Sequence, residues 1–139
     1  MSIGIVTQDL VTRVKSVASY NNRVGLAVGG KGMDPMNREL TRPAAWVIYS
    51  GDSALSTDPN SPSCIPLVSL NFIVTILVDY DDESSLISTH LPLLHETILA
   101  IQGNEPIPGS KWIYNGQALT ELTERMVWEQ SYTILMGVA

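Results

Sequence analysis

The sequence predicts an α+β fold, in which a mostly antiparallel mixed sheet is flanked on one face by two helices. Apolar residues recur at helical spacing near the start of the chain and again before Gly103. Apolar and polar residues alternate in several shorter runs, which indicates strands. A polar segment between two of these strands, residues 51–63, predicts a long projecting hairpin loop. The expected order is α-β-β-α-β-β-β.

Composition is consistent with one globular domain spanning residues 1–139. Hydrophobic residues make up 45% of the chain and charged residues 16%, which excludes disordered and fibrous classes. The longest apolar run is interrupted by polar residues and is too short to span a bilayer, and no secretory signal is recognisable, so we expect no membrane partner. The single Cys64 predicts a buried structural thiol in a reducing cytoplasm.

The first helix is predicted from four apolar residues at spacings of four, four and three, which share one face: Val6, Leu10, Val14 and Val17. Asn21 and Asn22 are expected to end it. A short alternating piece follows at 24–28, and residues 29–42 are expected to form a loop.

Two strands are predicted at 43–50 and at about 65–79. Pro43 stands at the start of the first, where its missing N–H matters least. The second strand has one fully apolar face and one mixed face, which is typical of a sheet with one face on the core. The apolar face is formed by Val68, Leu70, Phe72, Val74, Ile76 and Val78.

The second helix is predicted to follow the acidic residues 81–83, which favour the positive end of a helix dipole. Pro92 would fit a start near Thr89, in the first turn, or would otherwise kink the helix. Gly103 is expected to end it. The predicted buried stripe consists of Leu91, Leu94, Ile98 and Ile101.

The last third of the chain predicts three strands. Residues 111–114 and 117–122 flank Asn115-Gly116, a strong hairpin signal. The final strand is expected at 126–136. Its apolar face is formed by Trp128, Tyr132, Ile134 and Met136.

The stretch "GLAVGGKG", residues 25–32, partly matches a phosphate-binding loop. Gly30 and Lys31 fit the pattern, and the later run "VTILVDYDD" resembles a strand that positions a magnesium ion. However, Gly32 stands where a hydroxyl residue is needed, and Met33-Asp34-Pro35 cannot continue a helix directly from Lys31. Glycine flexibility in a loop is therefore favoured over nucleotide hydrolysis.

Other catalytic patterns are weak. His90 and His95 are five residues apart, whereas a helical metal pair needs four. The acidic run at 79–83 lacks the glycine and the distant glutamate of a calcium loop, so a solvated helix cap is favoured. Trp46 and the other two tryptophans fit core or interface packing. The sequence therefore predicts no enzyme, no cofactor and no metal site.

Charge is unevenly distributed along the chain. Residues 1–42 carry six basic and three acidic residues, a net charge of +3, whereas residues 43–139 carry two basic and eleven acidic residues, a net charge of −9. The overall charge of −6 makes sequence-specific nucleic-acid binding a poor interpretation. Solvated surface charge is the simplest reading, and charge-complementary stacking on copies of itself or on another protein is the alternative.

Three phrases carry a resemblance to a known family: "RPAAWVIYSGD" (42–52), "NFIVTILVDYDD" (71–82) and "GQALTELTERMVWEQSYTILMGVA" (116–139). Together with the order of elements, they resemble the phage tail terminator family in its contractile-tailed branch, over about residues 3–137. Residues 43–47 match best, Trp128 with the alternation after it matches next, and residues 19–42 match poorly.

The resemblance implies a structural protein of the virion, located at the neck end of the tail after assembly in the host cytoplasm. It implies a homo-oligomeric ring, hexameric in this family, that caps the tail tube and ends polymerisation of the tube. The implied partners are the tail tube protein, the tail sheath protein and the neck or connector proteins. A head–tail connector or another small ring-forming neck protein is the first alternative, and a small soluble enzyme or ligand-binding module is the second.

Candidate contact residues follow from the charges and the loop. Asp52 and Asp58, in the arm 51–63, are expected to reach a neighbouring subunit or the tube. A basic group is expected to meet an acidic tube, sheath or neck surface, and Trp46 to pack in the core or at an interface. The basic group consists of Lys31, Arg38 and Arg42. The acids expected to meet the basic segment of an adjacent subunit are Asp79, Asp81, Asp82 and Glu83.

Overall fold

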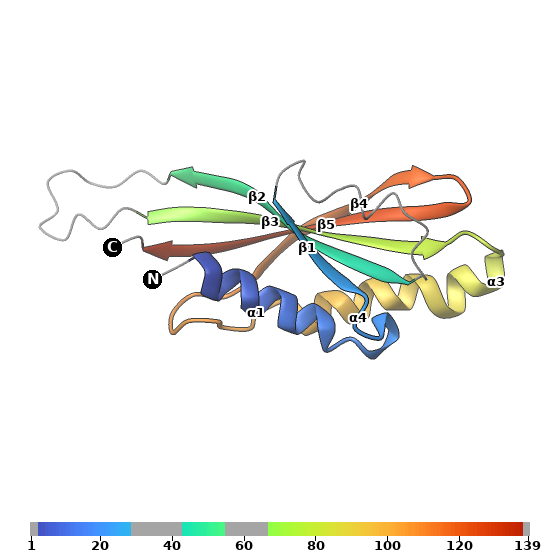
Figure 1. The fold of residues 1–139 in the computed structure, drawn as a ribbon, viewed down its shortest axis with the longest axis horizontal. Coiled ribbons are helices and arrows are strands. Elements are labelled where there is room, and N and C mark those ends of the chain that lie inside the picture. Colours follow the sequence, from blue (N-terminus) through green and yellow to red (C-terminus); the bar gives the residue numbers. More distant parts are fainter. Residues whose placement is uncertain (1–2, 29–42, 55–66, 138–139) are drawn as a thin grey trace, which may run out of the picture.

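A computed structural model describes residues 3–28, 43–54 and 67–137 of the chain (Figure 1). The helical elements are α1 (Ile3–Lys15), a 3-10 turn η1 (Ala18–Tyr20), α3 (Glu83–Ser85), a π-turn η2 (Leu86–His90) and α4 (Leu91–Ile101). The strands are β1 (Val24–Val28), β2 (Ala44–Ala54), β3 (Leu67–Asp79), β4 (Ile113–Leu122) and β5 (Arg125–Gly137).

The predicted α+β class is confirmed. The five strands form one mixed sheet in the order β1-β2-β3-β5-β4, in which β1 pairs parallel with β2 and every other pair is antiparallel. Figure 1 shows α1 and α4 side by side on the same face of this sheet. The order of elements differs from the prediction, because three strands precede the second helix and two follow it.

Helix α1 buries most of the predicted stripe, namely Val6, Leu10 and Val14, and Val17, just after the helix, belongs to the same core. The helix ends at Lys15, earlier than expected, and the 3-10 turn continues to Tyr20. Asn21 and Asn22 then adopt positive φ angles of 47° and 63°, which reverse the chain into β1.

Helix α4 is preceded by a longer helical run than the sequence predicts. That run begins at Glu83, and Pro92 lies in the first turn of α4, directly after the π-turn. Proline has no N–H to donate to the preceding turn. A π-turn at this point therefore sacrifices few backbone hydrogen bonds. The buried stripe is centred on Leu93, Leu94, Thr97 and Ile101, so the predicted burial of Leu91 is wrong.

The hairpin predicted at Asn115-Gly116 is wrong. Both residues lie inside β4, where the register with β5 shifts between Tyr114 and Gly116 and leaves Asn115 as an extra residue. Gly116 has a φ of 127°, so the glycine serves a β-bulge in place of a turn. A second shift leaves Thr120 extra, and the chain reverses at 123–124.

Strands β2 and β3 form the predicted antiparallel hairpin. Strand β2 extends to Ala54, beyond the predicted end at residue 50, and the register shifts around Ser50. Residues 51–54, expected in the loop, therefore belong to the strand. The remainder of the predicted projecting loop lies outside the described residues.

A hydrogen-bonded group of polar side chains lies inside the core. Gln130, fully buried in β5, donates from Nε2 to the carbonyl of Leu94 at 2.9 Å and to Oε1 of Gln117 at 3.1 Å. Its own Oε1 accepts a hydrogen bond of 2.8 Å from the Tyr132 hydroxyl. These bonds join α4 to β4 and β5, and thereby fix the position of the helix on the sheet.

Candidate interaction surface

The two edges of the sheet are formed by β1 and β4. Among the described residues no strand pairs with the outer side of either one. The start of β4 is covered by the segment after α4, since the backbone N–H of Tyr114 donates to Oε1 of Gln102 at 2.6 Å. The outer edge that remains for pairing is therefore residues 116–122 of β4. Unpaired strand edges are templates for the addition of another strand.

Exposed apolar side chains accompany the β4 edge. Leu119 and Leu122 are 41% and 54% exposed and stand opposite Trp128 and Met126 of β5, whose side chains pack on the helix-covered side of the sheet. Surface leucines that cluster beside an open strand edge are typical of contact surfaces.

The helical run beside β4 carries apolar residues on its outer flank. Leu91 lies seven and eleven residues before Ile98 and Gln102, so it shares their flank of α4, which is the flank bonded to β4. Ile87, one turn earlier, is 63% exposed, and Leu91 is 41% exposed. The opposite flank of α4 meets the end of α1, where Leu99 and Ala100 line a shallow hollow with residues 16–18.

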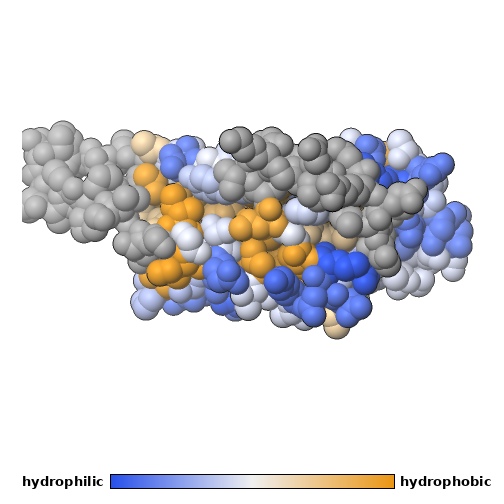
Figure 2. Space-filling view, viewed as in Figure 1, coloured by the Kyte–Doolittle hydropathy of each residue, from blue (hydrophilic) through white to orange (hydrophobic). Residues whose placement is uncertain are grey.

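Figure 2 shows the face that carries α1 and β1. Apolar side chains gather over β1, and hydrophilic side chains dominate the end of the molecule that carries α3. Leu26 of β1 is 49% exposed. Both edges of the sheet therefore present exposed apolar residues.

The hydrophilic end brings together acids from two parts of the sequence. Asp79, the last residue of β3, stands opposite Arg125, the first residue of β5. The N–H of Tyr80 donates to the carbonyl of Glu124 at 3.1 Å, so the turn between β4 and β5 lies against the start of α3. The acids gathered at this end are Asp79, Asp81, Asp82, Glu83, Glu121 and Glu124.

Two of the predicted acids have local structural roles. Asp82 caps α3, because its Oδ1 accepts the N–H of Ser85 at 2.7 Å, which confirms the predicted helix cap. Asp81 accepts the N–H of Asp82 and lies 3.2 Å from Nε2 of His90. The hydrogen bond from the backbone of Asp82 and the contact with His90 hold the pKa of Asp81 below its usual value.

The other predicted contact residues do not gather at this end. Lys31, Arg38, Arg42 and Asp58 lie outside the described residues. Asp52 accepts a hydrogen bond of 3.1 Å from the Tyr49 hydroxyl, near the opposite end of the sheet. It pairs with Leu70, nine residues before Asp79 on β3, so about 30 Å separates it from the acidic end.

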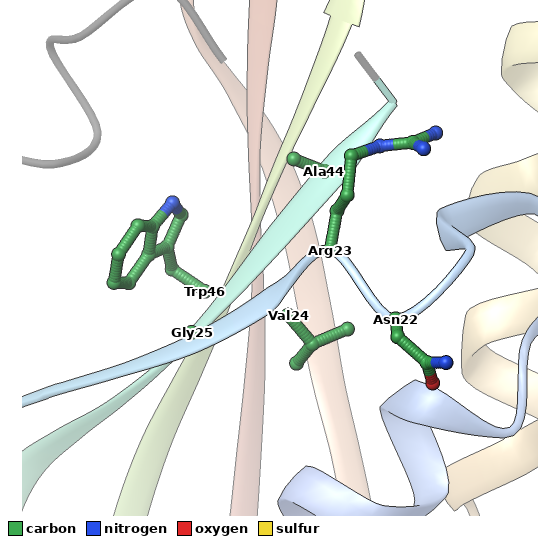
Figure 3. Close-up of a pocket in the computed structure, with 6 residues that line it drawn as sticks. All are labelled: Asn22, Arg23, Val24, Gly25, Ala44 and Trp46. Atoms are coloured by element: carbon green, nitrogen blue, oxygen red, sulfur yellow. The ribbon is translucent and has the colours of Figure 1, made fainter. Parts of the chain in front are cut away.

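Trp46 lies on the face of the sheet that α1 and α4 do not cover (Figure 3). Its ring packs directly over Gly25, where an added Cβ would lie 2.2 Å from a ring carbon. Gly25 is therefore required for close packing of an indole, which explains this glycine without a phosphate ligand. Beside the ring is a cavity of about 230 Å³, and Figure 3 shows the Arg23 guanidinium directed away from the indole.

The described residues hold no group of three or more His, Cys, Asp or Glu side chains arranged to bind a metal ion. Nor does any helix among them have the length and apolar character to cross a membrane.

No protein-family model matches the sequence, and no curated protein matches it. Among solved structures, the chain is similar to a chain from the virion of a native gene transfer agent particle, with a TM-score of 0.55 and 8% sequence identity. The similarity covers 99% of this chain and 100% of the other. At this identity the match shows a shared fold.

Proposed function

We propose that this chain is a structural protein of a phage-like virion that forms a closed ring, hexameric in the resembled family, on the end of the tail tube. The ring stops addition of tube subunits and presents its other face to neck or connector proteins, with the last sheath ring as a further partner. The protein acts at the neck end of the tail after assembly in the host cytoplasm.

One observation carries the proposal: the fold matches a virion chain over the full length of both chains. The sequence resemblance to tail terminators supports the same class of function. The two sheet edges that no described strand pairs with, and the exposed apolar residues beside them, supply surfaces for protein contact.

Tail length tests the termination role directly. Particles assembled without this protein should carry tubes longer than normal when viewed by electron microscopy, because nothing then stops polymerisation. Tails of normal length that fail to join heads would instead identify a head–tail connector, which is the alternative function. Normal, joined tails would contradict both.

Two binding measurements separate these assembly roles from a small enzyme or ligand-binding module. Native mass spectrometry should detect a ring, either of the free protein or of the protein bound to tube. Calorimetry with ATP and Mg²⁺ should give no binding heat, because Gly25 packs against Trp46 inside a strand. Stoichiometric nucleotide binding would overturn the structural assignment.

A further inference from the structure

We propose that the outer edge of β1 in one copy of the chain adds to the 116–122 edge of β4 in the next copy, so that the sheet continues from subunit to subunit. This inference rests on the proposed ring function and names the surface through which the ring forms. Three properties of the described residues support it: strand direction, side-chain match and charge.

Strand direction makes the new pair antiparallel. Strand β1 runs parallel to β2, and each step from β2 to β3, β5 and β4 reverses direction, so β1 and β4 run in opposite directions. If a second copy continues the sheet with its helices on the same side, its β1 runs antiparallel to β4. The start of β1 then lies beside the end of β4.

Side chains on the helix-covered side match in this arrangement. Val24 stands opposite Ala45 and packs against the main core, so Leu26, two residues on, points to the same side. Leu119 and Leu122 of β4 point to that side as well. The arrangement therefore places the exposed Leu26 of one copy beside the two exposed leucines of the next, and it buries apolar surface on both.

Charges at the same junction are complementary. Arg23 directly precedes β1, and its guanidinium bonds the carbonyl oxygens of Pro43 and Ser19, with no carboxylate within ion-pair distance among the described residues. The end of β4 that it would approach belongs to the acidic end defined above, which carries six acids. A basic strand start thus meets an acidic strand end.

The contact is heterologous, because it joins two different edges. Each copy therefore has one edge to donate and one to receive, and a fixed rotation between copies closes them into a ring with no edge left over.

Paired cysteines test the seam. In a full-length Cys64→Ser background, Leu26→Cys is combined with Leu119→Cys or with Leu122→Cys, and the proteins are oxidised both free and in assembled particles. We expect a ladder of covalent oligomers on a non-reducing gel from at least one pair, because cross-strand neighbours lie within disulfide reach. The matched control is Leu26→Cys with Ala118→Cys, which stands opposite Glu129 on the other side of the sheet. Absence of a ladder from both test pairs, or an equal ladder from the control, overturns the proposal.

Charge reversal supplies a second measurement that does not depend on oxidation. Arg23→Glu and Glu124→Lys should each weaken self-association about two- to fivefold, as expected for a surface ion pair, and the double variant should recover it. Lys111→Glu makes the same charge change before the start of β4, at the opposite end of that strand from Glu124, and should leave association unchanged. A double variant as weak as the two single changes combined would contradict the contact.

Failure of this inference differs from failure of the proposed function. If tails without the protein are overlong but no seam forms between β1 and β4, the edge pairing is wrong and termination stands. If the seam forms but tail length and head joining are normal without the protein, the function is wrong and the edge pairing stands.

Discussion

The two faces of the sheet differ in how their buried polar groups are hydrogen-bonded. On the face that carries α1 and α4, most buried polar groups are paired: Gln130 makes three hydrogen bonds and the Tyr20 hydroxyl meets Thr97 at 2.7 Å, although Trp128 Nε1 is buried there without a partner in the described structure. On the other face, Trp46 Nε1 and Thr75 Oγ1 are buried without a hydrogen-bond partner in the described structure. The helical face thus gains specificity from polar pairing, whereas the other face depends on close apolar packing.

The largest expected contrast between the two faces comes from truncating adjacent residues of β3. Phe72 is fully buried on the helical face and stacks edge-on against Trp112, with ring centroids 5.3 Å apart. Phe72→Ala should lower the free energy of unfolding by about 3–5 kcal/mol in urea denaturation. Ile73→Ala, at a half-buried position on the other face, should cost clearly less. Equal losses would show that both faces contribute equally to stability.

The polar pairing of the helical face is tested by Gln130→Met, which keeps the size of the side chain and removes its hydrogen bonds. The Tyr132 hydroxyl then loses its acceptor inside the core, whereas the Leu94 carbonyl lies within α4 and keeps its place in the helical hydrogen-bond ladder, so we expect a loss of up to about 3 kcal/mol. Gln8→Met, at an exposed position of α1 outside this network, is the control and should cost far less. A neutral Gln130→Met would mean that polar pairing does not distinguish the two faces.

Packing on the other face is tested by Gly25→Ala. The added methyl group would overlap the Trp46 ring, so we expect a loss of about 2 kcal/mol from overpacking, measured by urea denaturation. Trp46→Leu in the same chain should restore part of that loss, because it removes the ring that the methyl group meets. If the double variant is no better than Gly25→Ala alone, the close approach is not what requires glycine.

Alkaline pH should lower the stability of the protein through two buried tyrosines on the helical face. Burial raises the pKa of Tyr20 and of Tyr132 well above the ordinary value of 10.0. Unfolded tyrosines then ionise first as pH rises, so the stabilisation is complete below pH 10 and falls progressively above it. Denaturation between pH 8 and pH 11 should show this decline.

Tyr20→Phe sharpens that measurement. The variant should lose about 1 kcal/mol at pH 8 with its bond to Thr97, and its stability should then decline less steeply with pH. Tyr80→Phe, at an exposed position, is the matched control. An unchanged alkaline decline in Tyr20→Phe would exclude Tyr20 as a source of the effect.

The sequence predicted those parts of the fold that have long, unbroken periodicity. The stripe of α1 and the alternation of β3 extend over several turns or strand repeats, so burial of one face determines them. The predictions failed where the same residues are compatible with two different local structures. Asn115-Gly116 provides the same backbone freedom to a bulge as to a turn, and tertiary pairing with β5 decided between them.

The acidic end shows how much of the candidate surface could be predicted from the sequence. The run at 79–83 was recognisable because its residues are adjacent in sequence, but Glu121 and Glu124 were missed. They join it only because β3 pairs with β5, which places Asp79 opposite Arg125. A predicted register between those two strands would have found them, whereas charge counting along the chain does not.

The two bulges of β4 have a consequence for the chain before it assembles. An extra residue bends a strand and increases its twist, and β4 has one at Asn115 and one at Thr120. Fibrils grow by stacking flat, identical strands in register, and a bent strand is a poor template for that growth. The bulges therefore make β4 a poor template for amyloid-like growth between newly made, still unassembled copies.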